Sequence, residues 1–321
     1  MQIQTIFINE YGRLRSGWRF AVFLLAYTFL SLFFAESVKI LLVRLPIGYS
    51  DDSLLGFFVP VFIFAVLSIL VGWLCGRFLE GLPFRALGVW LTKNWLKDIC
   101  LGVLFGAASI LLAAGIAVVF GNLSLNFNQN RGSSAILLTL STSLFVFTVG
   151  AIAEEALFRG YLFQTLSRAN LAWLAIAITS LFFASAHLNN ENADYVSTLN
   201  TALAGIWFGI AYLKTRTLWF PIGLHLAWNW TQGAILGIPV SGITKLTTAP
   251  LFEVSDFGTK QITGGNYGIE GGIACTVALI ISMLAIHFAP FLKPTEEMLA
   301  LTSQEKFSEV SARKNAGAEK I

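Results

Sequence analysis

The chain has 321 residues, of which 56% are hydrophobic and only 12% are charged, and its mean hydropathy is +0.72. This apolar composition excludes a soluble globular protein. The net charge of +3 comes with no basic tract of the kind that binds nucleic acid, so no nucleic-acid partner is expected. The chain is therefore predicted to be an all-α polytopic membrane protein whose constant partner is membrane lipid.

Eight apolar segments follow one another along the chain. A helix that crosses a bilayer needs about 20 mainly apolar residues. The eight candidates are 20–43, 54–74, 99–120, 137–166, 171–187, 199–213, 218–238 and 273–291. The first apolar run is too long for a signal-peptide core and lacks a small-residue cleavage site, so it is interpreted as a retained span.

Lys and Arg are distributed unevenly over the flanks of these segments. If the N-terminus is cytosolic, the inner flanks carry Arg13, Arg15, Arg19, Arg77, Arg85, Lys93, Lys97, Arg168, Lys214 and Arg216. The outer flanks carry Arg44, Arg131, Lys245 and Lys260. Because cytosolic flanks are enriched in cations, eight spans with both termini in the cytosol are predicted.

The domain organisation follows from the same pattern. Residues 1–19 form a cytosolic flank, 20–292 the transmembrane helical domain, and 293–321 a charged cytosolic tail that is expected to be solvated and partly disordered. Residues 240–272 form a long glycine-rich connection outside the cytosol. Long connections are uncommon unless they are functional or disordered, so this one is either a lid over a site or a plain connector.

Two adjacent glutamates and an arginine lie deep in the fourth apolar segment. Glu155 and Arg159 are four residues apart, which predicts an ion pair on one helical face. Glu154 points about 100° away from that face and is left without this partner. An ionisable side chain at membrane depth is a candidate functional residue. Glu154 is therefore a candidate general base, and a member of a structural charge cluster is the alternative.

A histidine ends the fifth segment, one turn after Phe183. The polar stretch 167–172 predicts a turn between two antiparallel helices, and Glu154 and His187 are nearly equidistant from it. Residues equidistant from such a turn lie at the same depth, so Glu154 and His187 are expected to face each other. Phe183 is expected to pack on the His187 ring. A hydrogen-bonded core histidine is the alternative for His187.

A second histidine, His225, begins a pairing with Asn229 in the seventh segment. Four residues apart on a helix, the two side chains share a face and offer two hydrogen-bond donors. Two such donors suit an oxyanion site, where they would stabilise negative charge on a carbonyl oxygen. Hydrogen bonding between membrane helices is the alternative.

The three pairings, in this order on three apolar segments, resemble the CAAX protease and bacteriocin-processing family of intramembrane proteases, also called the Abi family. The resemblance covers about 137–238, which would be the catalytic core. It implies a peptidase in which Glu154 and His187 activate a water molecule and His225 and Asn229 hold the oxyanion, with Glu155, Arg159 and Phe183 in support. The substrate would be a peptide or protein, membrane-embedded or lipidated. The glycine-rich stretch 263–272 is similar to bacterial members, which implies location in the bacterial cytoplasmic membrane.

Two further points bear on the chemistry. Family members are also called metalloproteases, but the motifs contain no HExxH helix and a Glu-activated water requires no metal; if zinc binds, its ligands would be Glu154, His187 and His225. The catalytic cavity is expected to open toward the cytosol. The competing functions are a transporter or proton pathway that uses the same buried Glu and His, and a non-catalytic immunity-type membrane scaffold.

Overall fold

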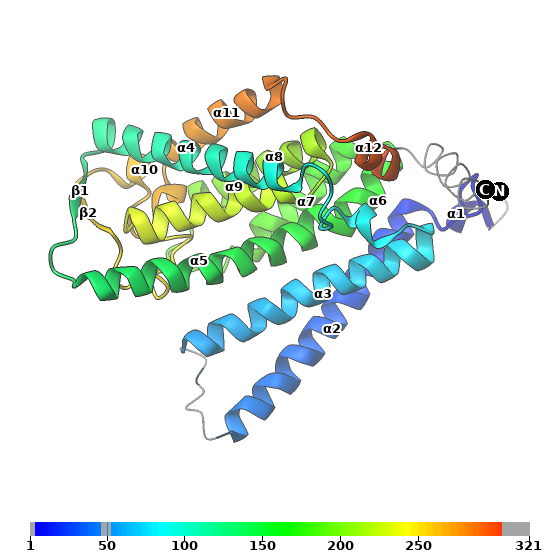
Figure 1. Ribbon diagram of the computed structural model, residues 1–321, viewed down its shortest axis with the longest axis horizontal. Coiled ribbons are helices and arrows are strands. Elements are labelled where there is room, and N and C mark those ends of the chain that lie inside the picture. The colour runs from blue at the N-terminus through cyan, green and yellow to red at the C-terminus, as the bar shows by residue number, and fades with distance from the viewer. Residues whose placement is uncertain (1–3, 46–49, 51–52, 304–321) are drawn as a thin grey trace.

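The computed structural model describes residues 4–45, 50 and 53–303. Helices run back and forth along one long axis (Figure 1). The apolar helices, in chain order, are α2 (Ser16–Arg44), α3 (Leu54–Glu80), α4 (Trp95–Gly121), α5 (Ser133–Glu155), α6 (Leu162–Arg168), α7 (Ala172–Ala186), α8 (Tyr195–Thr215), α9 (Trp219–Trp230) and α11 (Ile273–Phe288). A π-helical segment (Ala156–Tyr161) joins α5 to α6, so that the two form one continuous unit, and a second π-helical segment (Thr231–Ile235) extends α9.

The prediction of a helical membrane protein is confirmed. Each of the eight predicted apolar segments coincides with one of these units. Five of the units among the described residues are long and apolar enough to cross a bilayer, namely α2, α3, α4, the continuous α5 to α6 run and α8, whereas α7 and α11 are shorter apolar helices. Eight crossings with both termini in the cytosol remain a prediction.

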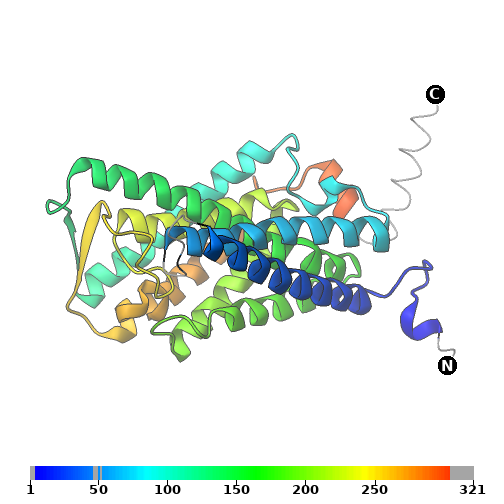
Figure 2. The same ribbon diagram turned by 90° about the horizontal axis from the view of Figure 1, so that it is seen from below.

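The alternation of the helices gives the molecule two ends. At the end where α2, α4, α7 and α9 begin, called the termini end, lie the short helices α1 (Gln4–Phe7), the 3₁₀ turn Phe84–Leu87 and α12 (Glu296–Thr302) (Figures 1 and 2). Met298 of α12 is fully buried, so the predicted solvated tail is in fact folded as far as α12. The remainder of that tail, 304–321, lies outside the described residues.

The opposite end, called the loop end, carries the connections α4 to α5, α7 to α8 and 236–272. Strand β1 (Leu123–Phe127) pairs antiparallel with β2 (Phe252–Asp256), with Leu123 opposite Asp256. Helix α10 (Lys260–Thr263) and the 3₁₀ turns Gly265–Tyr267 and Ile269–Gly271 follow β2. The long connection predicted at 240–272 therefore consists largely of short folded elements.

Glycines set the position of α9 against α4. A Cβ at Gly102 or Gly106 of α4 would collide with the backbone oxygens of Phe220 and Leu224, and one at Gly223 of α9 with that of Ile99. Small residues four apart allow membrane helices to approach this closely. Helix α9, which carries His225 and Asn229, is thereby fixed in both depth and rotation.

A buried charge cluster joins the helices at the termini end. The Glu80 carboxylate of α3 contacts Arg19 of α2 and accepts two hydrogen bonds from Arg168 of α6, at 2.8 and 2.9 Å. All three side chains are almost fully buried. Removing one partner of such a cluster leaves uncompensated charge, so Glu80 ties the α2–α3 hairpin to the rest of the bundle.

The arrangement of the helices predicts that the loop end and the termini end lie on opposite sides of the membrane. Ser255 lies in β2 at the loop end and Ser303 follows α12 at the termini end. Single cysteines at these positions in a cysteine-free background should react with a membrane-impermeant thiol reagent from opposite sides of the membrane. Labelling of both cysteines from the same side would contradict the single crossing by α11 between them, and with it the model of eight crossings.

Candidate active site

The two adjacent glutamates end α5, and the helix changes its winding directly after them. Residues Ala156–Tyr161 are π-helical, and Gly160 departs from helical backbone angles with φ −72° and ψ −132°. Such π-bulges occur often at functional sites. Here the two glutamates diverge: the Glu154 side chain is 36% exposed and lines a cavity, while the Glu155 side chain is completely buried.

Glu155 connects three elements behind the cavity. Its Oε1 accepts a hydrogen bond from Arg159 at 3.3 Å, so the predicted ion pair forms, and a second from His225 Nδ1 at 2.9 Å. Arg159 in turn donates to the backbone oxygen of Gly205 in α8 at 2.9 Å. A charged pair in the membrane needs such additional hydrogen bonds to offset the cost of burial.

Aromatic rings enclose the Arg159 guanidinium. Its central carbon lies 4.8 Å from the ring centroid of Phe183 and 4.9 Å from that of Phe208. Phe208 also stacks on the His225 ring at 4.7 Å. Cation–π contacts stabilise a desolvated cation, so these rings hold both Arg159 and His225 in place.

His187 is the first residue after α7, and two contacts with Phe183 fix the orientation of its ring. Its Nδ1 lies 2.8 Å from the backbone oxygen of Phe183, and the Phe183 ring packs at 4.8 Å, as the spacing of the pair predicts. A carbonyl oxygen only accepts hydrogen bonds, so Nδ1 carries the hydrogen. In the neutral ring, Nε2 is then free to accept a proton.

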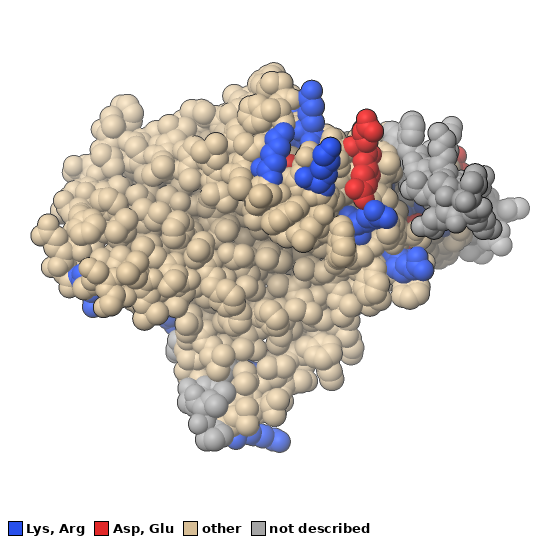
Figure 3. Space-filling model, viewed as in Figure 1, with Lys and Arg blue, Asp and Glu red and all other residues tan. Residues whose placement is uncertain are grey.

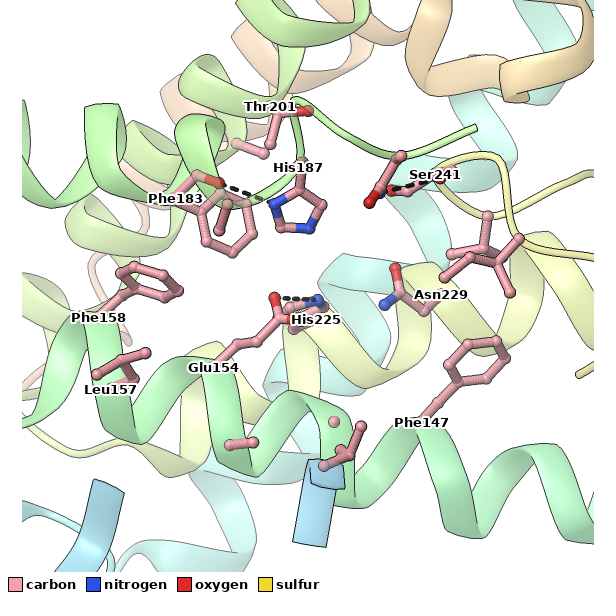
Figure 4. Close-up of a pocket in the computed structure, with 18 of the residues that line it drawn as sticks. Phe147, Glu154, Leu157, Phe158, Phe183, His187, Thr201, His225, Asn229 and Ser241 are labelled. Carbon is pink, nitrogen blue, oxygen red and sulfur yellow. Dashed lines mark hydrogen bonds and ion pairs between the residues drawn. The ribbon is translucent and has the colours of Figure 1, made fainter. Parts of the chain in front are cut away.

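One cavity of about 630 Å³ brings the candidate catalytic residues together. Glu154 from α5, His187 after α7, and His225 and Asn229 from α9 all line it. Figure 4 shows the four side chains pointing into this space from different elements. Glu154 Oε2 lies 3.8 Å from His225 Nε2. The turn between α6 and α7, closed by a hydrogen bond from Leu171 N to Leu166 O, is what places Glu154 and His187 opposite each other.

The Glu154 carboxylate has unused hydrogen-bonding capacity. Its Oε2 is buried and accepts no hydrogen bond from the described residues. Buried polar atoms in proteins are normally paired with protein groups or ordered water. An oxygen of this kind beside two imidazoles and an amide is suited to binding a water molecule.

A further carboxylate in the cavity wall was missed by the sequence reasoning. Glu270, in the 3₁₀ turn Ile269–Gly271, accepts hydrogen bonds from Trp228 Nε1 at 3.3 Å, from Gln232 Nε2 at 3.2 Å, and from both the backbone N and the hydroxyl of Ser241. Burial raises the pKa of this carboxyl, and the hydrogen bonds from Ser241 and Gln232 partly offset the rise. Glu270 thus joins the end of α9 to the segment that covers the cavity.

The signal for Glu270 was present but indirect. Glu270 is the one charged residue in the glycine-rich stretch 263–272. Its partner Gln232 lies one helical turn after Trp228, and Asn190, after His187, donates to the backbone oxygen of Ser241 at 3.0 Å. Pairings four residues apart do not reveal a contact between residues 232, 241 and 270, because only the folded 236–272 segment brings them together.

The three residues named as possible zinc ligands, Glu154, His187 and His225, do not form a metal site. No group of three or more His, Cys, Asp or Glu side chains in the described part of the chain is placed to hold a metal ion. His225 directs Nδ1 away from the cavity to Glu155, and His187 directs Nδ1 to a backbone oxygen. Both rings keep Nε2 for the cavity, as a zinc-bound histidine does, but Glu154, His187 and His225 do not come together as a group of three that could hold a metal ion, so no step is derived through one.

The part of the sequence that carries these residues matches a known protein family. Residues 133–231 match the family model of type II CAAX prenyl endopeptidases, Rce1-like. The matched segment contains all three pairings, so the family resemblance is confirmed there. At the level of the family it implies a CAAX-protease-like hydrolase that is an integral membrane protein. A comparison with curated proteins gives no match.

Glu155→Gln should lower stability far more than Glu154→Gln. The first substitution leaves the fully buried Arg159 guanidinium without the charge of its ion-pair partner and replaces the carboxylate beside His225 by a neutral amide, at a cost of about 3–5 kcal/mol. Glu154 is partly exposed and pairs only at 3.8 Å with His225. Thermal unfolding of both variants in the same detergent measures the difference in stability. Equal losses in melting temperature would contradict the assignment of a structural role to Glu155 and not to Glu154.

Glu270→Ala should loosen the segment that covers the cavity. It leaves the donors of Trp228 and Ser241 without this acceptor, whereas Gln232 Nε2 keeps the backbone oxygen of Pro239. One unpaired buried group costs about 1–3 kcal/mol. We expect a lower melting temperature and faster limited proteolysis within 236–272. Glu253→Ala is the matched control, because Glu253 lies in the same segment and accepts only a hydrogen bond from Asn130 at an exposed site. Equal proteolysis of both variants would show that Glu270 does not hold the segment.

Proposed function

We propose that the protein is an intramembrane endopeptidase that hydrolyses a peptide bond with a water molecule activated by Glu154 and His187. The observation that carries the proposal is the Glu154 Oε2, which accepts no hydrogen bond from the described residues and lies in a cavity that it shares with His187, His225 and Asn229. The match of 133–231 to the CAAX endopeptidase family supports the same reaction class.

The chemistry follows from the placement of these groups. The Glu154 carboxylate accepts a proton from water as the water oxygen attacks the carbonyl carbon of the substrate, and His187 Nε2 orients that water. The carbonyl oxygen becomes an oxyanion, which accepts hydrogen bonds from the Asn229 amide and from Nε2–H of a protonated His225. The proton held by Glu154 then passes to the leaving nitrogen. The products are a carboxylic acid and an amine.

Supporting residues hold this arrangement without touching the substrate. Glu155 fixes the ring of His225 through Nδ1, and the Phe183 backbone oxygen fixes that of His187. A group that orients a catalytic ring by its second nitrogen sets which nitrogen faces the substrate. The two imidazoles therefore both direct Nε2 into the cavity.

An apolar arm of the cavity favours a hydrophobic substrate. Leu32 of α2 and Phe57, Val61 and Phe64 of α3 line the cavity on the side of the α2–α3 hairpin. Pockets lined mainly by apolar side chains bind apolar groups and use a few polar ones for orientation. The substrate in this proposal is a peptide or protein that carries apolar residues or a lipid next to the cleaved bond.

Cleavage of a peptide library in detergent tests the proposal. Wild-type protein should hydrolyse members of the library, and Glu154→Gln should reduce the rate about 10²- to 10⁴-fold, the usual contribution of a general base, with an unchanged melting temperature. Glu36→Gln is the matched control, since Glu36 is an exposed carboxylate of α2 that does not line the cavity. Equal rates for wild type and Glu154→Gln would rule out the hydrolytic role and leave transport or scaffolding.

A further inference from the structure

We infer that Glu270 is a positioning residue for the candidate oxyanion donor Asn229. The inference rests on the proposed peptidase function and adds a residue to it from outside 133–231, the part of the chain that matches the family model. Glu155 fixes His225 in the middle of α9, and Glu270 fixes the end of the same helix. Each of the two oxyanion donors therefore has its own carboxylate behind it.

The end of α9 is less regular than the rest of the helix. Asn229 is the last residue but one of α9, and the residues that follow, Thr231–Ile235, are π-helical. A π-helical turn replaces the usual hydrogen bonds between residues four apart. Figure 4 shows the Asn229 side chain pointing into the cavity from α9. The direction of this side chain therefore depends on contacts from outside the helix.

The Glu270 carboxylate binds donors on both sides of Asn229. Its Oε1 accepts a hydrogen bond from Trp228 Nε1 at 3.3 Å, and its Oε2 accepts one from Gln232 Nε2 at 3.2 Å. Trp228 directly precedes Asn229, and Gln232 follows it by three residues. The Trp228 ring also packs edge-on against Trp207 of α8, with 5.5 Å between the ring centroids. Because both neighbours are fixed, the backbone that carries Asn229 has little freedom to turn.

Two helices hold Glu270 itself in place. Asn200 of α8 donates from Nδ2 to the backbone oxygens of Glu270 and Gly272, at 2.8 and 2.9 Å. The Oδ1 of Asn200 accepts a hydrogen bond from Thr276 of α11 at 2.7 Å. A site is held more precisely by regular elements than by loops. The carboxylate is therefore anchored to α8 and α11, although it lies in the 236–272 connection.

A second branch of the same network leads to His187. Glu270 Oε2 also accepts hydrogen bonds from the backbone N and the hydroxyl of Ser241. Asn190 donates to the Ser241 backbone oxygen at 3.0 Å, and its own backbone N donates to the His187 backbone oxygen at 3.1 Å. Ser241 has a φ of +48°, a conformation that costs free energy for residues other than glycine and persists where surrounding contacts enforce it. Glu270 thus ties the end of α9 to the turn that carries His187.

A carboxylate at this place is unusual for the molecule. On the face that Figure 3 shows, Asp and Glu gather at the termini end, near α12, and hardly any lie toward β1 and β2. Glu270 instead lines the cavity, in the glycine-rich part of the loop end. Removing a carboxylate from water is costly unless donors surround it. The hydrogen bonds to Glu270 offset that cost, and they come from residues next to Asn229 and from the segment bound to the His187 turn.

A displaced oxyanion donor lowers kcat more than it changes KM. The donor contacts the carbonyl oxygen fully only when that oxygen becomes charged, so its loss affects the transition state and not substrate binding. Removing one such donor reduces kcat about 10²- to 10³-fold. Glu270→Gln keeps Asn229 but weakens the contacts that orient it. We therefore expect kcat to fall about 10- to 100-fold, with KM changed less than about threefold.

A double-mutant cycle with Asn229 tests the inference. Glu270→Gln has nearly the size of the native side chain, and its effect is measured in wild type and in Asn229→Ala with a peptide that wild type cleaves. In Asn229→Ala the second substitution should lower kcat less than about threefold, because the group that Glu270 positions is already absent. Glu253→Gln, at an exposed site of the same connection, should leave kcat unchanged in both backgrounds. Equal losses from Glu270→Gln in both backgrounds would overturn the inference.

Hydrogen exchange at the end of α9 provides a measurement that does not depend on catalysis. In detergent, Glu270→Gln should speed the exchange of the backbone amides of 226–236 about tenfold or more, and Glu253→Gln should not. Trp228→Phe, which removes one donor and keeps an aromatic ring, replaces Glu270→Gln in both measurements if that variant does not fold. Exchange also decides where Asn229→Ala retains too little activity for a cycle. Unchanged exchange in 226–236 would overturn the inference even if kcat falls.

The outcomes separate the two proposals. Wild-type cleavage with equal losses in both backgrounds, or with unchanged exchange, overturns the role of Glu270 and leaves the peptidase intact. Faster exchange in Glu270→Gln without any wild-type cleavage in detergent refutes the peptidase and retains Glu270 as the residue that orients Asn229. Unchanged exchange without wild-type cleavage refutes both. A loss of kcat that depends on Asn229, together with faster exchange, supports both.

Discussion

The structure of the site depends on the burial of one carboxylate. Glu155 sits between the Arg159 guanidinium and Nδ1 of His225, with no solvent exposure. In an apolar surrounding, neither charge of the pair is tolerable without the other, so the end of α5 must turn this residue inward. Its neighbour Glu154 is then necessarily directed to another face, which is the cavity. The same contact fixes which nitrogen His225 offers to that cavity. One structural ion pair thus determines the orientation of two candidate catalytic groups.

Close backbone packing provides the rigidity that this arrangement needs. Glycines of α4 and α9 bring the two backbones together, and Gly205 of α8 lies so close to Ser180 of α7 that a Cβ would collide with it. The α8 glycine also leaves its carbonyl oxygen to Arg159. Catalytic geometry tolerates only small displacements, so groups on tightly packed helices are better placed than groups on loops. His187 is the exception, because it follows α7, and there the Phe183 backbone and ring supply the missing constraint.

Much of the site could be predicted because its determinants are local. Helical spacing is enough to pair Glu155 with Arg159, and the polar turn before α7 is enough to set Glu154 opposite His187. The π-helical segment after Glu155 could not be predicted, since no local propensity marks it. The bond from Glu155 to His225 joins residues 70 positions apart. The contacts of Glu270 depend on the fold of 236–272, and composition marks that region only as glycine-rich.

The depth of the site restricts how water can reach it. Hydrolysis consumes water, yet Glu154 and His225 lie well inside helices whose outer faces are apolar, as the exposed Leu137, Phe145 and Leu181 of α5 and α7 illustrate. Water must therefore reach these groups through the cavity that they line. The Glu155–Arg159 pair, which lies behind these groups, has no solvent exposure and at the same time orients His225. The interaction that builds the candidate catalytic geometry is thus also one that keeps water from the side of His225 that faces Glu155.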